Sequence, residues 1–406
     1  MHAACGNRDV RRKALRAVQR QPPRHGILDR RRAIATMMAA GGAVPLLAAN
    51  AFDAPAQNGA TLAQAAAHNG RVYGAAVRIR RIDAEQDYRQ AVVQECALLV
   101  PEYEMNWNEI EPAYGQLSFD RIDALVDFAT DQGKKLRGHV LFWHLGVPEW
   151  ASAMLRERRD WGLVNHYVGF VMTRYRDLVH QWTVVNEAID PGQRSDGLRN
   201  SIYLEAFGPG YIHRAFTLAR GLAPNGLLLL SDYGLEYDNA EQRARRYYFL
   251  KLIERLKGAG TPLDCIGLQG HLDLRLGQVS APAIAAFLRE LNDMNLPVMV
   301  TELDVKESQY VASAQERDRM VADETRRYLD AVLSHGRCLG VTTWGLSDRH
   351  SWIIEITPQD YARFPGAWKN GESPGINRGL PLSWEMKPKP MYFALRDALW
   401  RIRLRR

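Results

Sequence analysis

Two glutamates, Glu187 and Glu302, stand at positions where each could act as a catalytic carboxylate. Each closely follows a short apolar run typical of a buried strand, and Trp, His, Asn and Gln residues occupy similar places elsewhere in the chain. Two carboxyl groups that flank a glycosidic bond can hydrolyse it: one protonates the leaving oxygen while the other attacks the anomeric carbon or activates a water molecule. Tryptophan rings offer flat surfaces for sugar rings, and amides and imidazoles can bond hydroxyl groups. A lone glutamate at a strand end could equally form a buried ion pair. Two such glutamates accompanied by Trp, His, Asn and Gln residues favour glycoside hydrolysis.

Residues so far apart in sequence need a scaffold that brings them together, and apolar runs alternate regularly with segments of helical periodicity. We expect strands at Val72–Val77, Ala97–Val100, Lys135–Phe142, Gln181–Val185, Leu227–Leu230, Cys265–Gln269, Val298–Thr301 and Gly340–Trp344. We expect helices at Asp83–Glu95, Phe119–Gln132, Val164–Leu178, Ala240–Lys257, Ala281–Asn292, Ala314–Ser334 and Met391–Arg401. Eight buried strands that alternate with helices predict the α/β class, as a (β/α)8 TIM barrel with a single catalytic domain.

Polar and aromatic residues follow six of the eight predicted strands. Barrel enzymes place their chemistry at the carboxyl ends of the strands, where side chains project into the mouth of the barrel. The residues at these ends are His139, Trp143, His144, Asn186, Glu187, Asp232, Tyr233, Gln269, His271, Glu302, Asp304, Trp344, Asp348 and Trp352. We therefore expect them to share one rim.

Six segments of the chain resemble motifs of glycoside hydrolase family 10, the retaining endo-β-1,4-xylanases. These segments are Arg137–His144, Trp182–Ala188, Gly267–His271, Thr301–Val305, Thr343–Asp348 and Lys389–Tyr392. They occur in the family's order, and the resemblance covers nearly everything from about residue 70 to the end. It implies a barrel that hydrolyses internal β-1,4-xylosidic bonds by double displacement and needs no cofactor or metal, because two glutamates suffice.

The resemblance also implies a role for each matching residue. Glu187 is expected to be the general acid/base, and Glu302 the nucleophile that forms a covalent glycosyl-enzyme. His271, held by Asp304, would keep Glu302 ionised, while Asn186 would bond the 2-hydroxyl of the sugar at the cleavage point. The expected substrate-binding residues are Glu102, His139, Trp143, Asn186, Gln269, His271, Trp344 and Trp352.

Three positions depart from the family pattern. Where family members usually carry Asn, Lys and Gln, this chain has Tyr103, Asn106 and Gly146. The usual residues bind the sugar that lies one unit from the cleavage point toward the non-reducing end. The subsite at the cleavage point therefore looks intact, while the neighbouring subsite is altered. Tyr103 could stack on a sugar or obstruct it. Xylan, a bacterial exopolysaccharide or another β-linked glycan all stay open as substrates, and a glycan-binding protein with an inactive site is a further alternative.

The N-terminus carries the chain's basic character. Its formal net charge is +7, but residues 1–35 hold ten basic and two acidic residues, which leaves 43 basic and 44 acidic residues in the body. The body of the chain thus has no surplus of positive charge for binding nucleic acid. Arg30–Arg32 precede an uncharged stretch, Ala33–Phe52, that ends in small residues. This order predicts a signal peptide of the twin-arginine kind over residues 1–56, a linker over 57–69 and the catalytic domain over 70–406.

We accordingly expect an exported protein, periplasmic or secreted, that acts as a monomer on a polysaccharide or oligosaccharide without stable membrane insertion. A single N-terminal membrane anchor is the alternative. The composition, with 46% hydrophobic and 24% charged residues, excludes a disordered or fibrous chain. Of the four cysteines, Cys5 lies in the predicted signal, and Cys96, Cys265 and Cys338 show no zinc-binding spacing. A disulfide between two of these three stays open.

Overall fold

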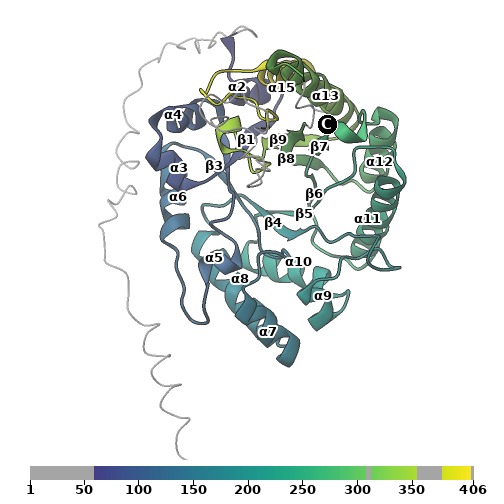
Figure 1. Ribbon diagram of the computed structural model, residues 1–406. Helices are drawn as coiled ribbons and strands as arrows, with labels where there is room; N and C mark the ends of the chain where they lie inside the picture. Colours follow the sequence, from purple (N-terminus) through teal and green to yellow (C-terminus); the bar gives the residue numbers. More distant parts are fainter. Residues whose placement is uncertain (1–58, 308–311, 354–376, 404–406) are drawn as a thin grey trace, which may run out of the picture. The chain divides into compact units, whose positions relative to one another are not determined.

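Parallel strands form a closed barrel in the part of the chain that the computed structural model describes, residues 59–307, 312–353 and 377–403 (Figure 1). Neighbours in sequence are neighbours in the sheet, and pairing of β9 with β1 and of β6 with β8 closes the ring. A short additional strand, β7 (His271–Asp273), pairs with the carboxyl end of β8. The eight barrel strands are β1 (Val72–Val77), β2 (Leu98–Pro101), β3 (Lys135–Gly138), β4 (Gln181–Asn186), β5 (Leu227–Asp232), β6 (Cys265–Leu268), β8 (Val298–Lys306) and β9 (Cys338–Thr343). The predicted TIM barrel is confirmed.

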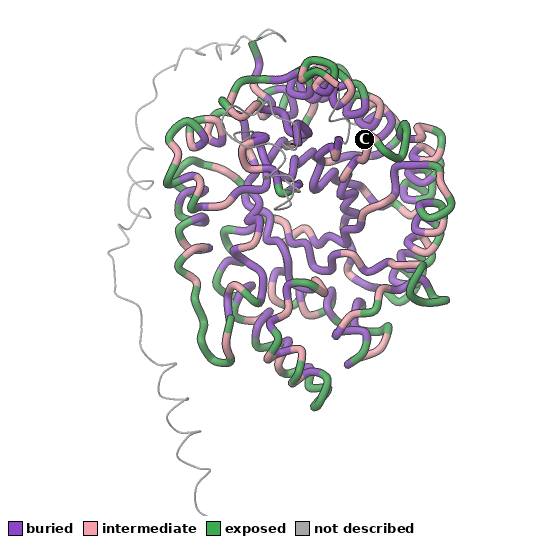
Figure 2. Tube along the Cα trace, in the orientation of Figure 1, coloured by how far each residue is buried: buried purple, intermediate pink, exposed green. Residues whose placement is uncertain are grey.

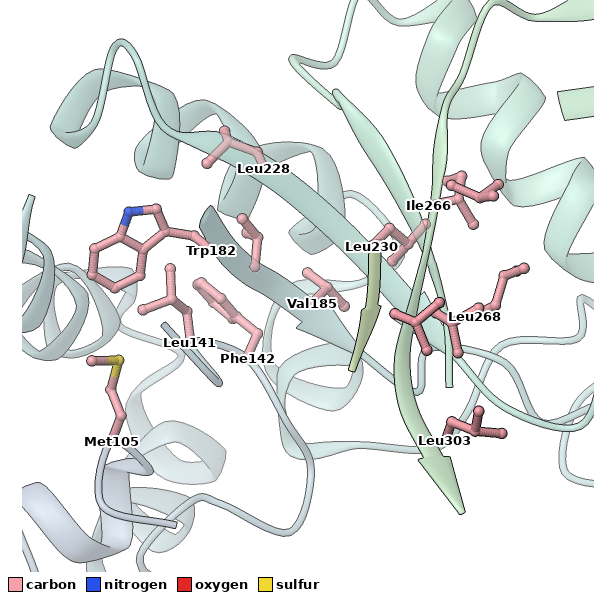
Figure 3. Close-up of a cluster of buried hydrophobic side chains, with 14 of the residues drawn as sticks. Met105, Leu141, Phe142, Trp182, Val185, Leu228, Leu230, Ile266, Leu268 and Leu303 are labelled. Carbon is pink, nitrogen blue, oxygen red and sulfur yellow. The ribbon is translucent and has the colours of Figure 1, made fainter. Parts of the chain in front are cut away.

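The strands are buried on both faces, as the near-continuous apolar runs predicted (Figure 2). Inside the barrel, Leu98, Leu229, Cys265 and Met299 pack into a small cluster of their own. A larger cluster lies elsewhere in the core, and Figure 3 shows apolar side chains of several neighbouring strands gathering in it. The barrel is therefore a packed core rather than a pore, and its open end is left for chemistry.

Helices surround the barrel and turn an apolar stripe toward it. In α12 (Ala281–Asp293) the buried residues Ile284, Phe287, Leu288 and Leu291 follow the spacing of one helix face. The other helices are α3 (Ile79–Ala84), α4 (Gln86–Glu95), α5 (Trp107–Ile110), α6 (Asp120–Asp131), α7 (Glu149–Arg158), α8 (Trp161–Tyr175), α9 (Ile202–Phe207), α10 (Tyr211–Leu222), α11 (Ala240–Gly258), α13 (Ala314–His335) and α15 (Pro390–Arg401). The predicted helix at 83–95 corresponds to the end of α3 and the whole of α4, and α5, α7, α9 and α10 were not predicted.

The segment predicted as a linker, residues 57–69, contains a helix, and this prediction is corrected. Helix α2 (Leu62–His68) begins at a capping box in which Thr61 and Gln64 satisfy each other's backbone N–H groups. Leu62 is fully buried, and the His68 ring stacks on Trp400 of α15 with 4.0 Å between ring centroids. The Ala/Gln/Asn composition resembles a linker, but small alanines let α2 lie close against the barrel.

The predicted signal peptide lies outside the described residues. In the described ranges, Cys96, Cys265 and Cys338 are buried and none of the three forms a disulfide. The same ranges contain no helix with both the length and the apolar character that a membrane span requires.

Candidate active site

A cavity of about 560 Å³ lies at the carboxyl ends of the barrel strands. Every predicted catalytic or substrate-binding residue lines it, whereas Asp304 is fully buried behind His271. The lining residues are Glu102, Tyr103, His139, Trp143, His144, Leu145, Asn186, Glu187, Arg199, Tyr233, Gln269, His271, Glu302, Trp344 and Trp352. Residues from eight separate parts of the sequence thus meet in one space.

Glu302 sits on β8 and is held by His271. The Nε2 atom of His271 lies 3.3 Å from Oε2 of Glu302, and its Nδ1 atom lies 2.7 Å from Oδ1 of Asp304. Burial alone would lower the pKa of His271, but the two carboxylates outweigh it and raise this pKa well above its usual value. The buried Oε1 atom of Glu302 has no hydrogen-bond partner among the described residues, so this oxygen is available to a ligand.

Aromatic and basic residues complete the surroundings of Glu302. The Nε1 atom of Trp352 donates a hydrogen bond of 2.6 Å to the second oxygen of Asp304. His139 is buried edge-on against Trp344, and burial lowers its pKa to about 4, so its ring is neutral at ordinary pH. Arg137 lies fully buried and donates to the backbone oxygen of Thr301, next to Glu302. A neutral His139 can both donate to and accept from sugar hydroxyls.

Glu187 directly follows β4 and has an unusual backbone conformation. Its φ of 58° is left-handed, which costs a residue other than glycine on the order of 1–3 kcal/mol. The side-chain amides of Asn186 and Gln269 each lie 3.2 Å from its Oε1 atom, and Nδ1 of His144 lies 3.9 Å from Oε2. The carboxyl group of Glu187 therefore faces the same cavity as Glu302, with amide donors on one oxygen and an imidazole near the other.

Three aspartates expected at the rim, Asp232, Asp304 and Asp348, are buried and do not line the cavity, so this prediction is corrected. Asp232 is buried against Arg245 at 2.5 Å, and Asp348 is buried against Lys389 at 2.8 Å. Burial raises the pKa of each of these two aspartates to about 6, although the basic partner opposes the shift. Both carboxylates anchor the loops around the cavity instead of lining it.

Four lining residues received no catalytic or binding role from the sequence: His144, Leu145, Arg199 and Tyr233. His144 and Tyr233 follow predicted strands, and the sequence correctly predicted both at the rim. Arg199 follows no strand and belongs to no motif, and only the folded loop after β4 brings it to the cavity.

Comparison with known proteins identifies the family. The sequence profile described as glycosyl hydrolase family 10 matches residues 61–398. The chain belongs to glycosyl hydrolase family 10. Endo-1,4-beta-xylanase 1 of Humicola insolens is 32% identical over 289 residues, which are 70% of this chain and 65% of that protein. Endo-1,4-beta-xylanase A of Fusarium oxysporum is 31% identical over 294 residues, 70% of this chain and 86% of that protein.

Solved family 10 structures show the same architecture. The crystal structure of xylanase 10B from Thermotoga maritima superposes with a TM-score of 0.71 at 26% identity and covers 84% of this chain and 98% of that one. The xylanase 10B of Thermotoga petrophila, in complex with xylobiose, gives the same TM-score and identity.

Tyr103, one of the three positions expected to depart from the family pattern, lies beside Glu102 in the lining of the cavity. Both oxygens of Glu102 accept hydrogen bonds from Arg78, and Arg81 adds a third at 3.0 Å. The guanidinium of Arg78 also covers the ring of Tyr103, 4.2 Å from its centroid. Both carboxylate oxygens of Glu102 are therefore occupied by hydrogen bonds from arginines, and Tyr103 presents an aromatic surface to the cavity.

Proposed function

We propose that this family 10 member is a retaining endo-1,4-β-xylanase that acts on internal bonds of xylan. The observation that carries the proposal is the pair of glutamates in one cavity, with Glu302 held by His271 and Glu187 by amide donors. The relatives named as endo-1,4-β-xylanases support the choice of substrate.

The proposed reaction has two steps. Oε1 of Glu302 forms a bond to the anomeric carbon while the bond from that carbon to the leaving oxygen breaks and Glu187 gives this oxygen a proton. Glu187 then takes a proton from a water molecule, whose oxygen displaces Glu302 and restores the original configuration. Asn186 is positioned to bond the 2-hydroxyl, a contact that strengthens in the transition state. Trp344 and Trp352 would flank the sugar.

Release of reducing sugar from glucuronoxylan tests this proposal. The full chain is expected to release xylo-oligosaccharides and Glu302→Ala to release none, while proton NMR of the first product shows the β-anomer. Activity that Glu302→Ala retains, or an α-anomer as the first product, would contradict the proposed mechanism.

A second candidate substrate is a β-linked glycan other than plain xylan, such as a bacterial exopolysaccharide. The arginine-bound Glu102 and the aromatic Tyr103 support it, because lost polar contacts change discrimination between sugars strongly. The variant Tyr103→Asn, which carries the usual family residue, separates the two candidates. A gain of at least about tenfold in xylan hydrolysis by this variant would favour the other glycan, whereas a loss would show that Tyr103 serves xylan.

We also propose that the protein is exported through the predicted twin-arginine signal. The support is the sequence order of Arg30–Arg32, the apolar stretch and the small residues that follow. Cell fractionation with N-terminal sequencing of the processed protein tests it, since a chain that stays with the membrane would favour the anchor instead.

A further inference from the structure

The loop after β4 folds back on itself and returns to Glu187. Ile189 and Leu198 form an antiparallel bridge, and the backbone N–H of Asp190 donates to the oxygen of Gly197. Gly197 has a φ of 75°, and a Cβ atom there would lie 2.2 Å from the ring of Tyr248. Glycine is therefore needed for this turn, which fixes the position of the residue that follows the bridge, Arg199.

Arg199 is fixed against the backbone of Glu187 by several bonds. Its own N–H donates to the oxygen of Ala188, and its Nε atom donates a hydrogen bond of 2.9 Å to the backbone oxygen of Glu187. Its Nη2 atom donates to the hydroxyl of Tyr233 at 2.7 Å, and its Nη1 atom lies 3.2 Å from Asp190. The side chain is only 10% exposed, so these contacts are largely shielded from water.

The bonded carbonyl belongs to the residue with the left-handed backbone. Glu187 donates its own N–H to Ser231 of β5 and receives Arg199 on its oxygen, so both of its backbone groups are held. Backbone strain of this kind persists only where the surroundings determine it fully. Arg199 supplies the side-chain part of that restraint from a planar fork that a lysine cannot reproduce.

We propose that Arg199 is a positioning residue that holds the backbone of Glu187 in its left-handed conformation and so aims the carboxyl group at the leaving oxygen. The inference rests on the proposed role of Glu187 as the general acid/base. Arg199 itself transfers no proton, because a guanidinium stays protonated in proteins.

If the carboxyl group of Glu187 is displaced, the loss of activity should depend on the leaving group of the substrate. A phenyl leaving group is basic and needs a proton from Glu187, whereas 2,4-dinitrophenolate leaves without one. Displacement of the Glu187 carboxyl group should therefore reduce kcat/KM for phenyl β-xylobioside and leave kcat/KM for the dinitrophenyl compound unchanged. In the second step Glu187 must activate water for both substrates, so kcat on the dinitrophenyl compound should also fall. Azide attacks the glycosyl-enzyme without a base and should restore kcat on the dinitrophenyl compound.

The test compares Arg199→Lys in the full chain with wild type on both xylobiosides. We expect kcat/KM for the phenyl compound to fall at least about tenfold, a part of the roughly 10²–10⁴-fold that a positioned acid contributes, and azide to rescue kcat on the dinitrophenyl compound. Asp190→Asn, which removes the negative charge that pairs with Arg199, should act in the same direction but less. Arg194→Lys is the matched control, because Arg194 lies in the same loop and pairs with exposed Asp196.

The outcomes separate this inference from the proposed function. Equal losses on both compounds, or no rescue by azide, would show that Arg199 supports the fold or sugar binding and would overturn the inference alone. A wild type that cleaves neither xylobioside would overturn the proposed xylanase activity and the inference with it. Cleavage of the dinitrophenyl compound by Arg199→Lys shows at the same time that the variant is folded.

Discussion

His271 and Asp304 are register partners on β7 and β8, and their side chains meet at 2.7 Å between Nδ1 and Oδ1. Because residues two apart on a strand share a face, Glu302 lies on the same side of β8 as Asp304 and meets the other nitrogen of the same ring. One short strand pairing therefore aligns a carboxylate, an imidazole and a second carboxylate.

This alignment makes the effect of Asp304→Asn predictable. Asp304 raises the pKa of His271, so the variant should hold a proton on His271 less firmly and weaken the charged hydrogen bond to Glu302. A hydrogen bond to a charged group contributes about 1.5–3 kcal/mol, which corresponds to a loss of about tenfold to a hundredfold in kcat/KM. The alkaline limb of the pH–rate profile should also move to lower pH. An unchanged limb with full activity would show that His271 works without Asp304.

The two site histidines should shape the pH dependence of stability in opposite directions. Burial lowers the pKa of His139 to about 4, so between about pH 6.5 and 4 the unfolded chain takes up a proton that the folded chain refuses. Stability should fall by about 3 kcal/mol as the pH drops through this window. His271, with its raised pKa, contributes stability that is complete below about pH 6.5 and is lost as the pH rises through its folded value.

Urea unfolding measured from pH 4 to 9 checks both slopes. His139→Gln should flatten the acid side of the profile, and His271→Gln the alkaline side. His166→Gln, at an exposed position on α8, serves as the control and should leave both slopes in place. An acid slope that survives in His139→Gln would contradict the assignment.

Removal of Arg245 should destabilise the fold strongly. Arg245 and Asp232 are both almost completely buried, so Arg245→Met leaves a buried carboxylate without its partner. Such a loss costs about 3–5 kcal/mol. Arg243→Met is the matched control, because Arg243 lies on the same helix and pairs with Asp238 at an exposed site, where an ion pair contributes only about 0–1 kcal/mol. Equal unfolding free energies of the two variants would refute the distinction.

Helix α2 should behave as part of the catalytic domain. Leu62 is fully buried, and Leu62→Ala is expected to lower the free energy of unfolding by about 2–5 kcal/mol. Leu178→Ala, at a position with 42% exposure, should lower it by less than about 0.5 kcal/mol. Guanidinium unfolding of both variants measures the difference. If Leu62→Ala left the free energy of unfolding unchanged, the interpretation of this segment as a linker would be restored.

The sequence predicted the barrel and the residues of its cavity from two simple patterns. Apolar runs at regular spacing mark strands that are buried on both faces, and residues directly after such runs must lie at one end of the barrel. Glu187, Gln269 and Glu302 could therefore be placed in one site by their positions along the chain alone. Helix α10 was missed although Ile212, Ala215, Phe216 and Ala219 follow helical spacing.

Tertiary structure decided what depends on contacts between distant segments. Asp232 and Asp348 follow strands as Glu187 and Glu302 do, yet Arg245 and Lys389 draw them behind the rim. Arg199 follows no strand at all, and only the turn at Gly197 brings it to Glu187. The sequence by itself determined the fold and the two carboxylates, because strand and helix periodicity act locally. It could not show which charged side chains pair, because an ion pair depends on the final distance between atoms far apart in the chain.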